Sequence, residues 1–169
     1  MLITAEELSL HSVTIDKAYP AGDLDRRSGG FRQLSDLRLH ALAELVGSDI
    51  RIRGRFGTRL QVECDRCGLL VELPMEESFD LYYRPMSSIA REEEVEIPAN
   101  ELEVGFYSGE GVEVSDLVKE QVILALPMKI LCRLDCQGLC SVCGANLNVE
   151  RCQCRPVRND SPFARLTGR

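Results

Sequence analysis

The sequence predicts an α+β fold, a mostly antiparallel β-sheet or partly closed barrel with one packed helix and a cysteine-rich knuckle towards the C-terminus. Three observations lead to this prediction. Apolar residues alternate with other residues over 37–62, they adopt helical spacing over 115–126, and all eight cysteines occur in close pairs. We expect two parts, a β-rich body over residues 1–131 that includes the helix and a cysteine-rich tail over residues 132–169.

The strongest strand pattern is that of a long hairpin. Residues at every second position are apolar from Leu37 to Leu45, and the pattern resumes from Ile50 to Val62 after the turn Gly47-Ser48-Asp49. Such alternation on both sides of a glycine-containing turn is typical of two antiparallel strands with one buried face.

Shorter segments predict the remaining elements. We expect an edge strand over Ser12–Tyr19 and two further strands over Leu69–Leu73 and Ser78–Tyr83, which Pro74 and the residues after it separate. Two short apolar segments follow, at residues 102–107 and 112–114.

One helix is predicted at residues 115–126. Ser115 is a good N-cap residue, Asp116 suits the positive end of the helix dipole, and Pro127 ends the apolar pattern. We expect this helix to pack on the sheet.

Composition narrows the class of protein. The chain is 44% hydrophobic and 28% charged, as is common in globular proteins, and no apolar run approaches the roughly 20 residues of a membrane span. The N-terminus lacks the basic start and apolar stretch of a signal peptide, so we expect a cytoplasmic protein with reduced thiols. A net charge of −7 argues against tight non-specific binding to nucleic acid, although a local RNA footprint or a protein partner fits it.

The cysteine spacing predicts metal binding. A pair of cysteines separated by one to three residues can direct two thiolates at one tetrahedral zinc ion, with zinc–sulfur distances of about 2.3 Å. The four pairs are Cys64 with Cys67, Cys132 with Cys136, Cys140 with Cys143, and Cys152 with Cys154.

Eight thiolates suffice for two structural zinc ions. Chain order places Cys140, Cys143, Cys152 and Cys154 in a zinc knuckle and leaves Cys64, Cys67, Cys132 and Cys136 for the other site. Spacing alone also permits other groupings, such as the first pair with the third.

Paired cysteines have other uses besides structural zinc. Disulfides fit the pairing but not a reducing compartment, and a thioredoxin-like redox pair needs a βαβ context that Cys64 and Cys67 lack. An iron–sulfur cluster also takes four thiolates. A catalytic zinc site usually recruits His or a carboxylate, and the two histidines, His11 and His40, are far from any cysteine in the sequence. We expect no enzyme, since the chain also lacks nucleotide-binding loops and the HExxH motif.

The arrangement of these motifs resembles the YceD family, the large ribosomal RNA subunit accumulation proteins of bacteria and plastids. The resemblance covers nearly the whole chain. Its most specific parts are Glu63–Cys67, Leu124–Pro127 and Leu131–Asn148, followed by Cys152 and Cys154.

The resemblance implies a non-enzymatic, zinc-binding factor in bacterial-type ribosome biogenesis that supports accumulation of 23S-type large-subunit RNA. Its partner would be pre-ribosomal large-subunit RNA or a basic large-subunit ribosomal protein, with no membrane and no small-molecule substrate. The alternative is a zinc-ribbon interaction module or regulator that binds a protein or DNA and has no ribosomal role.

Two charged surfaces are candidates for partner binding. A basic stripe would suit RNA phosphates, and an acidic segment at residues 92–96 would suit a basic ribosomal protein. The plain alternative for each is a solvated surface. The candidate RNA-binding residues are Arg51, Arg53, Arg55, Arg59 and Arg66.

Overall fold

The computed structural model describes residues 1–24, 30–88 and 104–154. The chain forms two compact units. The first, here called the sheet unit, contains Met1–Val62 and Glu72–Met128, and the second, the cysteine unit, contains Glu63–Val71 and the residues from Lys129 onward. This division differs from the two parts expected from the sequence, because Glu63–Val71 joins the C-terminal residues.

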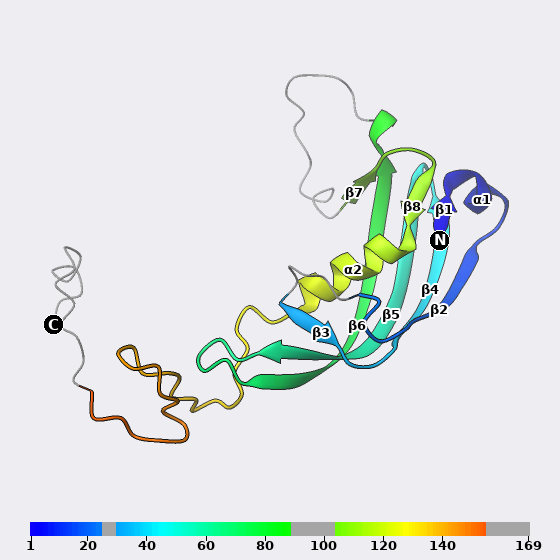
Figure 1. Ribbon diagram of the computed structural model, residues 1–169. Helices are drawn as coiled ribbons and strands as arrows, with labels where there is room; N and C mark the ends of the chain where they lie inside the picture. The colour runs from blue at the N-terminus through cyan, green and yellow to red at the C-terminus, as the bar shows by residue number, and fades with distance from the viewer. Residues whose placement is uncertain (25–29, 89–103, 155–169) are drawn as a thin grey trace, which may run out of the picture. The chain divides into compact units, whose positions relative to one another are not determined.

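The sheet unit is built on one six-stranded sheet in the order β2-β4-β5-β6-β7, and β3 also pairs with β5 (Figure 1). Only the β6–β7 pair is parallel among the pairings with a described register. The strands are β2 (Val13–Tyr19), β3 (Phe31–Gln33), β4 (Leu37–Val46), β5 (Asp49–Glu63), β6 (Leu70–Pro85) and β7 (Val104–Tyr107).

The structure confirms the predicted hairpin. Strands β4 and β5 pair antiparallel from Val46↔Asp49 to Arg38↔Gly57, so Gly47 and Ser48 form a two-residue turn. Gly47 has a φ of 65°, a conformation that glycine adopts without steric cost and that tight hairpin turns require. The predicted edge strand is also present, since β2 pairs with β4 at the end of the sheet.

The described strands do not form a closed barrel. Among the described strands, β2 and β7 are the two ends of the sheet and do not pair with each other. The sheet is therefore open and mixed.

The break predicted at Pro74 is absent, and β6 runs without interruption from Leu70 to Pro85. Among the described strands, β7 pairs only with Tyr82–Pro85, so β6 has an edge at Pro74. Proline lacks an N–H to donate and is tolerated at such an edge.

Helix α2 (Val114–Ala125) lies across one face of the sheet, as Figure 1 shows. It begins one residue before the predicted start, and its N-cap is Glu113, with no side-chain capping bond. Ser115, the predicted cap, instead donates to the Glu113 carboxylate at 3.0 Å. The helix buries Val114, Leu117, Val118 and Val122.

A second, two-stranded sheet was not predicted. Strand β1 (Leu2–Thr4) pairs antiparallel with β8 (Gly111–Glu113). Helix α1 (Ala5–Leu10) follows β1 and is capped by Thr4, whose hydroxyl accepts from the Glu7 N–H at 3.1 Å. The Thr-x-x-Glu spacing is a capping-box signature that would have revealed this helix.

The core of the sheet unit is mostly aliphatic, in keeping with an aromatic content of only 5% and the absence of Trp. No helix in the described part of the chain has the length and hydropathy to cross a bilayer. The fully buried large side chains of the sheet unit include Ile3, Ile15, Leu24, Leu37, Ile50, Ile52, Leu60, Val62, Val114, Val118 and Val122.

Candidate metal centres

The structure brings the eight cysteines into two groups of four within the cysteine unit. In each group, the four sulfur atoms lie within 4.8 Å of one another. The first centre is Cys64, Cys67, Cys132 and Cys136, and the second centre is Cys140, Cys143, Cys152 and Cys154. This is the grouping that chain order favours.

The sulfur separations in the first centre fit a tetrahedral ion. The Sγ atoms of Cys64 and Cys136 are 3.8 Å apart, and those of Cys67 and Cys132 are 3.7 Å apart. A tetrahedral ion bound at about 2.3 Å from each sulfur places its ligands about 3.8 Å from one another. Both groups can therefore hold a metal ion, and these two separations in the first centre match those of a tetrahedral site.

One local turn positions a cysteine pair in each centre. Gly68 follows Cys67 with a φ of 69°, and its N–H donates to the Cys64 carbonyl at 2.9 Å. Gly144 follows Cys143 with a φ of 73°, and its N–H donates to the Cys140 carbonyl, also at 2.9 Å. Glycine enters this left-handed region freely, so the Cys-x-x-Cys-Gly sequence closes a tight turn around two thiols.

Backbone N–H groups favour the thiolate form of one cysteine in each centre. Burial raises the pKa of Cys64, but N–H groups of Cys132, Arg66 and Cys67 outweigh burial and lower the pKa to about 6. N–H groups of Cys143 and Val142 lower the pKa of Cys140 to about 6. Thiolates are the form of cysteine that binds metal.

Burial and neighbouring sulfur atoms raise the pKa of one other cysteine in each centre. Burial and the neighbouring sulfurs, Cys136 first, raise the pKa of Cys132 to about 12. The Cys143 sulfur and burial raise the pKa of Cys154 to about 12. A divalent cation bound by the four sulfurs would lower these pKa values again, since a coordinated thiol is deprotonated.

The two centres differ in burial. Cys64, Cys67 and Cys136 are buried at 3%, 8% and 1% exposure, whereas Cys140 and Cys152 are half-buried and Cys143 is exposed.

Two polar side chains next to cysteines hold the first centre together. The Asp65 carboxylate accepts from the Ile130 N–H at 2.6 Å, and the Asp65 N–H donates to the Ile130 carbonyl at 2.9 Å. Arg66 donates to the Cys136 carbonyl at 2.6 Å. Arg66, a candidate RNA-binding residue from the sequence, thus also joins the two ligand-bearing segments of this centre.

The other four candidate arginines lie on one face of β5. They alternate with the buried residues from Ile50 to Leu60, as expected. Arg51 makes two bonds to Asp80, at 2.8 and 2.6 Å, and lies 3.4 Å from Glu44, which is also 3.8 Å from Arg53. Arg51 and Arg53 are thus partly neutralised by carboxylates on neighbouring strands.

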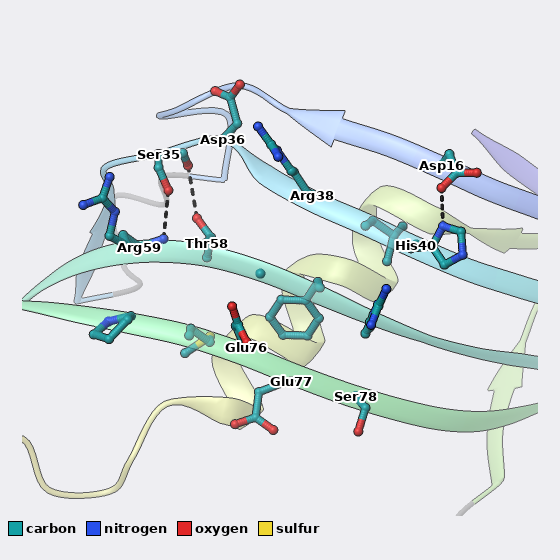
Figure 2. Close-up of a pocket in the computed structure, with 16 residues that line it drawn as sticks. Asp16, Ser35, Asp36, Arg38, His40, Thr58, Arg59, Glu76, Glu77 and Ser78 are labelled. Atoms are coloured by element: carbon teal, nitrogen blue, oxygen red, sulfur yellow. Dashed lines mark hydrogen bonds and ion pairs between the residues drawn. The ribbon is translucent and has the colours of Figure 1, made fainter.

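Arg55 and Arg59 are exposed and make no ion pair with a described residue. Both line a groove of ≈ 1270 Å³ on the sheet unit, together with Arg38 (Figure 2). Asp36, Glu76 and Glu77 line it too, so the groove has mixed charge. Sequence reasoning missed Arg38, which the pairing Arg38↔Gly57 brings between the positions of Arg55 and Arg59.

The acidic residues proposed from the sequence to receive a basic ribosomal protein, Glu92, Glu93, Glu94 and Glu96, lie outside the described residues.

Comparison with known proteins gives two chloroplastic relatives that share a name and one uncharacterized relative. The chain is 25% identical over 146 residues to the chloroplastic large ribosomal RNA subunit accumulation protein YCED homolog 1 of Arabidopsis thaliana. The matched segment covers 69% of this chain and 43% of that protein. It is 34% identical over 58 residues to the protein of the same name in Zea mays, covering 34% of this chain and 20% of that one. An uncharacterized protein of Mycobacterium leprae (strain TN) is 28% identical over 115 residues, covering 68% of this chain and 50% of that one.

The chain thus spans half or less of the length of these relatives. No solved structure matches it. The model of the family described as large ribosomal RNA subunit accumulation protein YceD matches residues 52–168, a segment that contains all eight cysteines and both candidate metal centres. This chain belongs to the YceD family.

Proposed function

We propose that this protein is a non-enzymatic, zinc-stabilised binding factor that acts in the cytoplasm and supports accumulation of large-subunit ribosomal RNA. The observation that carries the proposal is the family match over residues 52–168, whose description names this role. In this proposal the metal ions stabilise the fold and take no part in a reaction. Four thiolates complete the tetrahedral coordination of zinc and leave no open coordination position for a substrate.

Zinc is favoured by the ligand chemistry. A site of four thiolates selects zinc or an iron–sulfur cluster, and the first centre has the sulfur spacing of a single tetrahedral ion. Elemental analysis of the purified, reduced protein tests this assignment. We expect two zinc ions per chain, falling to one in a Cys140→Ser/Cys143→Ser variant. Iron together with acid-labile sulfide would contradict the assignment.

The cellular role is tested by complementation. In cells that lack this gene, wild-type protein should restore the ratio of large-subunit to small-subunit ribosomal RNA, and Cys136→Ser should not, because Cys136 is a buried ligand of the first centre. An unchanged ratio on loss of the gene would contradict a role in accumulation of large-subunit RNA.

The groove on the sheet unit is our proposed RNA contact. Arg55 and Arg59 are exposed and have no ion-pair partner among the described residues, so their guanidinium groups are available to phosphates without loss of an existing pair. The carboxylates beside them limit general attraction to polyanions and favour a local footprint.

Paired substitutions test this surface. Arg55→Ser/Arg59→Ser should weaken binding to large-subunit RNA and lower the slope of log K against log salt by roughly 1 for each phosphate that the variant no longer neutralises. The matched control is Arg51→Ser/Arg53→Ser, which removes the same charge from the same strand at positions already paired with Asp80 and Glu44. Equal weakening in both variants would indicate a response to net charge, and unchanged binding in both would remove this face from the RNA interface.

A further inference from the structure

A side chain from the loop of the second centre contacts a ligand of the first. Asn148 lies between Cys143 and Cys152 in the sequence, yet its Nδ2 donates to the Sγ of Cys136 at 3.4 Å. Cys136 is only 1% exposed, so this hydrogen bond reaches a buried sulfur of the first centre.

The orientation of the Asn148 amide is fixed by its partners. Its Oδ1 accepts from the Gln137 N–H at 2.8 Å and from the Arg133 guanidinium at 2.9 Å. Its Nδ2 donates to the Asn146 Oδ1 at 2.8 Å as well as to the Cys136 sulfur. Two acceptor and two donor positions are therefore all used, and a flipped amide would place an oxygen against the sulfur.

The backbone around Asn148 is tied to the second centre. The Cys140 N–H donates to the Ala145 carbonyl at 2.8 Å, and the Leu147 N–H donates to the Gly138 carbonyl at 3.0 Å. Leu139 and Asn146 form an isolated antiparallel bridge. The loop that carries Asn148 is thus folded back on the segment that joins Cys136 to Cys140.

A metal ion in the second centre closes this loop. Its ligands flank the loop on both sides, with Cys140 and Cys143 before it and Cys152 and Cys154 after it. Without that closure, the residues of the loop regain conformational freedom, and Asn148 must be ordered before it can donate to the Cys136 sulfur. Hydrogen bonds to metal ligands typically change metal affinity by roughly 10–100-fold.

We propose that Asn148 couples the two metal centres, so that metal in the second centre strengthens metal binding in the first. The inference rests on the proposed metal binding by both centres. Coupling is reciprocal, so metal in the first centre strengthens the second by the same factor. Metal in the more exposed second centre thereby raises the metal affinity of the buried first centre.

A double-mutant cycle on the full-length protein tests the coupling. One arm is Cys152→Ser/Cys154→Ser, which disables the second centre, and the other is Asn148→Asp, which keeps an acceptor for the Gln137 N–H but turns an oxygen towards the Cys136 sulfur. The probe is ¹¹³Cd²⁺, whose thiolate resonances report each centre separately, titrated against a competing chelator. The resonance that disappears in the cysteine variant identifies the second centre.

We expect each arm alone to weaken the first centre by roughly 10–100-fold. In the Asn148→Asp background, disabling the second centre should weaken the first by no more than about 2-fold, because the connecting bond is already absent. The first-centre ¹¹³Cd resonance should also shift in Asn148→Asp, since the hydrogen bond to its sulfur is removed.

The matched control is Gln137→Glu. It makes the same amide-to-carboxylate change beside the same ligand, but the Gln137 side chain donates to the Asp135 carbonyl and touches no sulfur. This variant should retain first-centre affinity. If Asn148→Asp prevents metal binding altogether, Asn148→Ala removes the same bonds without adding charge and completes the cycle.

Each other outcome overturns the proposal. Equal weakening of the first centre by the cysteine variant in both backgrounds would show that the second centre acts without Asn148. An unchanged first centre in Asn148→Asp would show that the hydrogen bond has no effect. A protein with no ¹¹³Cd–thiolate resonance at all would refute metal binding itself, which separates failure of the proposed zinc-stabilised factor from failure of the coupling.

Discussion

The sheet unit and the cysteine unit are stabilised by different means. The sheet unit buries many aliphatic side chains on its strands and on α2, whereas the buried cluster of the cysteine unit consists of Cys64, Cys67 and Cys136. Only Val71, Leu131 and Cys132 pack against that cluster, while Leu134 and Val149 are 95% and 83% exposed. So small an apolar cluster cannot offset the conformational entropy of folding, and we infer that metal–thiolate bonds supply the difference.

Metal removal is the strongest test of this difference. Structural zinc sites with four thiolates contribute apparent binding free energies of about 10–16 kcal/mol, and with the proposed zinc ions bound this would also be folding free energy of the cysteine unit. A chelator under reducing conditions should therefore unfold residues 129–154 and leave the sheet unit folded. Amide hydrogen exchange, resolved by residue, measures both units in one sample. Retained protection around Cys136 without metal would show that the cysteine unit folds without bound metal.

A cavity in the core of the sheet unit should destabilise that unit and leave the cysteine unit with its metal. Leu37→Ala removes a side chain of zero exposure and should destabilise the sheet unit by about 2–5 kcal/mol in urea, with metal content unchanged. The matched control is Leu10→Ala, in the same unit but 83% exposed, which should change stability by less than about 0.5 kcal/mol. Loss of metal from Leu37→Ala would show that the two units do not fold independently.

Ion pairs between neighbouring strands should contribute least to the stability of the sheet unit. Asp49 in β5 accepts two bonds from Arg84 in β6, at 3.1 and 3.0 Å, and this guanidinium lowers the pKa of the Asp49 carboxyl. A lowered folded-state pKa stabilises the fold above the unfolded pKa of about 3.9, and this stabilisation is lost as the pH falls through the folded value.

Asp49→Asn should therefore cost roughly 0.5–1 kcal/mol at pH 7, and the difference from wild type should shrink as the pH falls below the unfolded pKa and through the lowered folded one. Urea unfolding of both proteins across this pH range measures the difference. A difference that stays constant as the pH is lowered would assign the effect to packing of the side chain rather than to its charge.

The sequence predicts the elements whose signal is local. Alternation from Leu37 to Val62 fixes the faces and turn of the hairpin, and helical spacing places α2 within one residue of its start. Cysteine spacing predicts metal binding and, read in chain order, favours the two groups that the structure shows, although spacing alone permitted others. The pairings between segments distant in the sequence were not predictable, including β1 with β8 and the parallel pair of β6 with β7. A local pattern of residues predicts a strand but not the strand with which it pairs.

The side chains that support the metal centres were also missed for a physical reason. Asn148 resembles an ordinary turn residue, and its bond to Cys136 exists only because the loop folds back over the preceding segment. Arg66 resembles a surface cation, and only the folded chain shows that it donates to the Cys136 carbonyl. Pro74 gave a false break, because the sequence does not show that β6 has an edge there.

During synthesis, the hairpin of β4 and β5 can form before the first metal centre, because only two residues connect its strands. A hairpin with so short a connection forms in about 1–10 μs once both strands are available. The first centre must instead join Cys67 to Cys132, across more than 60 residues. At roughly 5–20 residues per second, a ribosome needs several seconds to add that stretch. Cys64 and Cys67 therefore leave the ribosome well before their partners, and their thiols depend during that interval on a reducing environment.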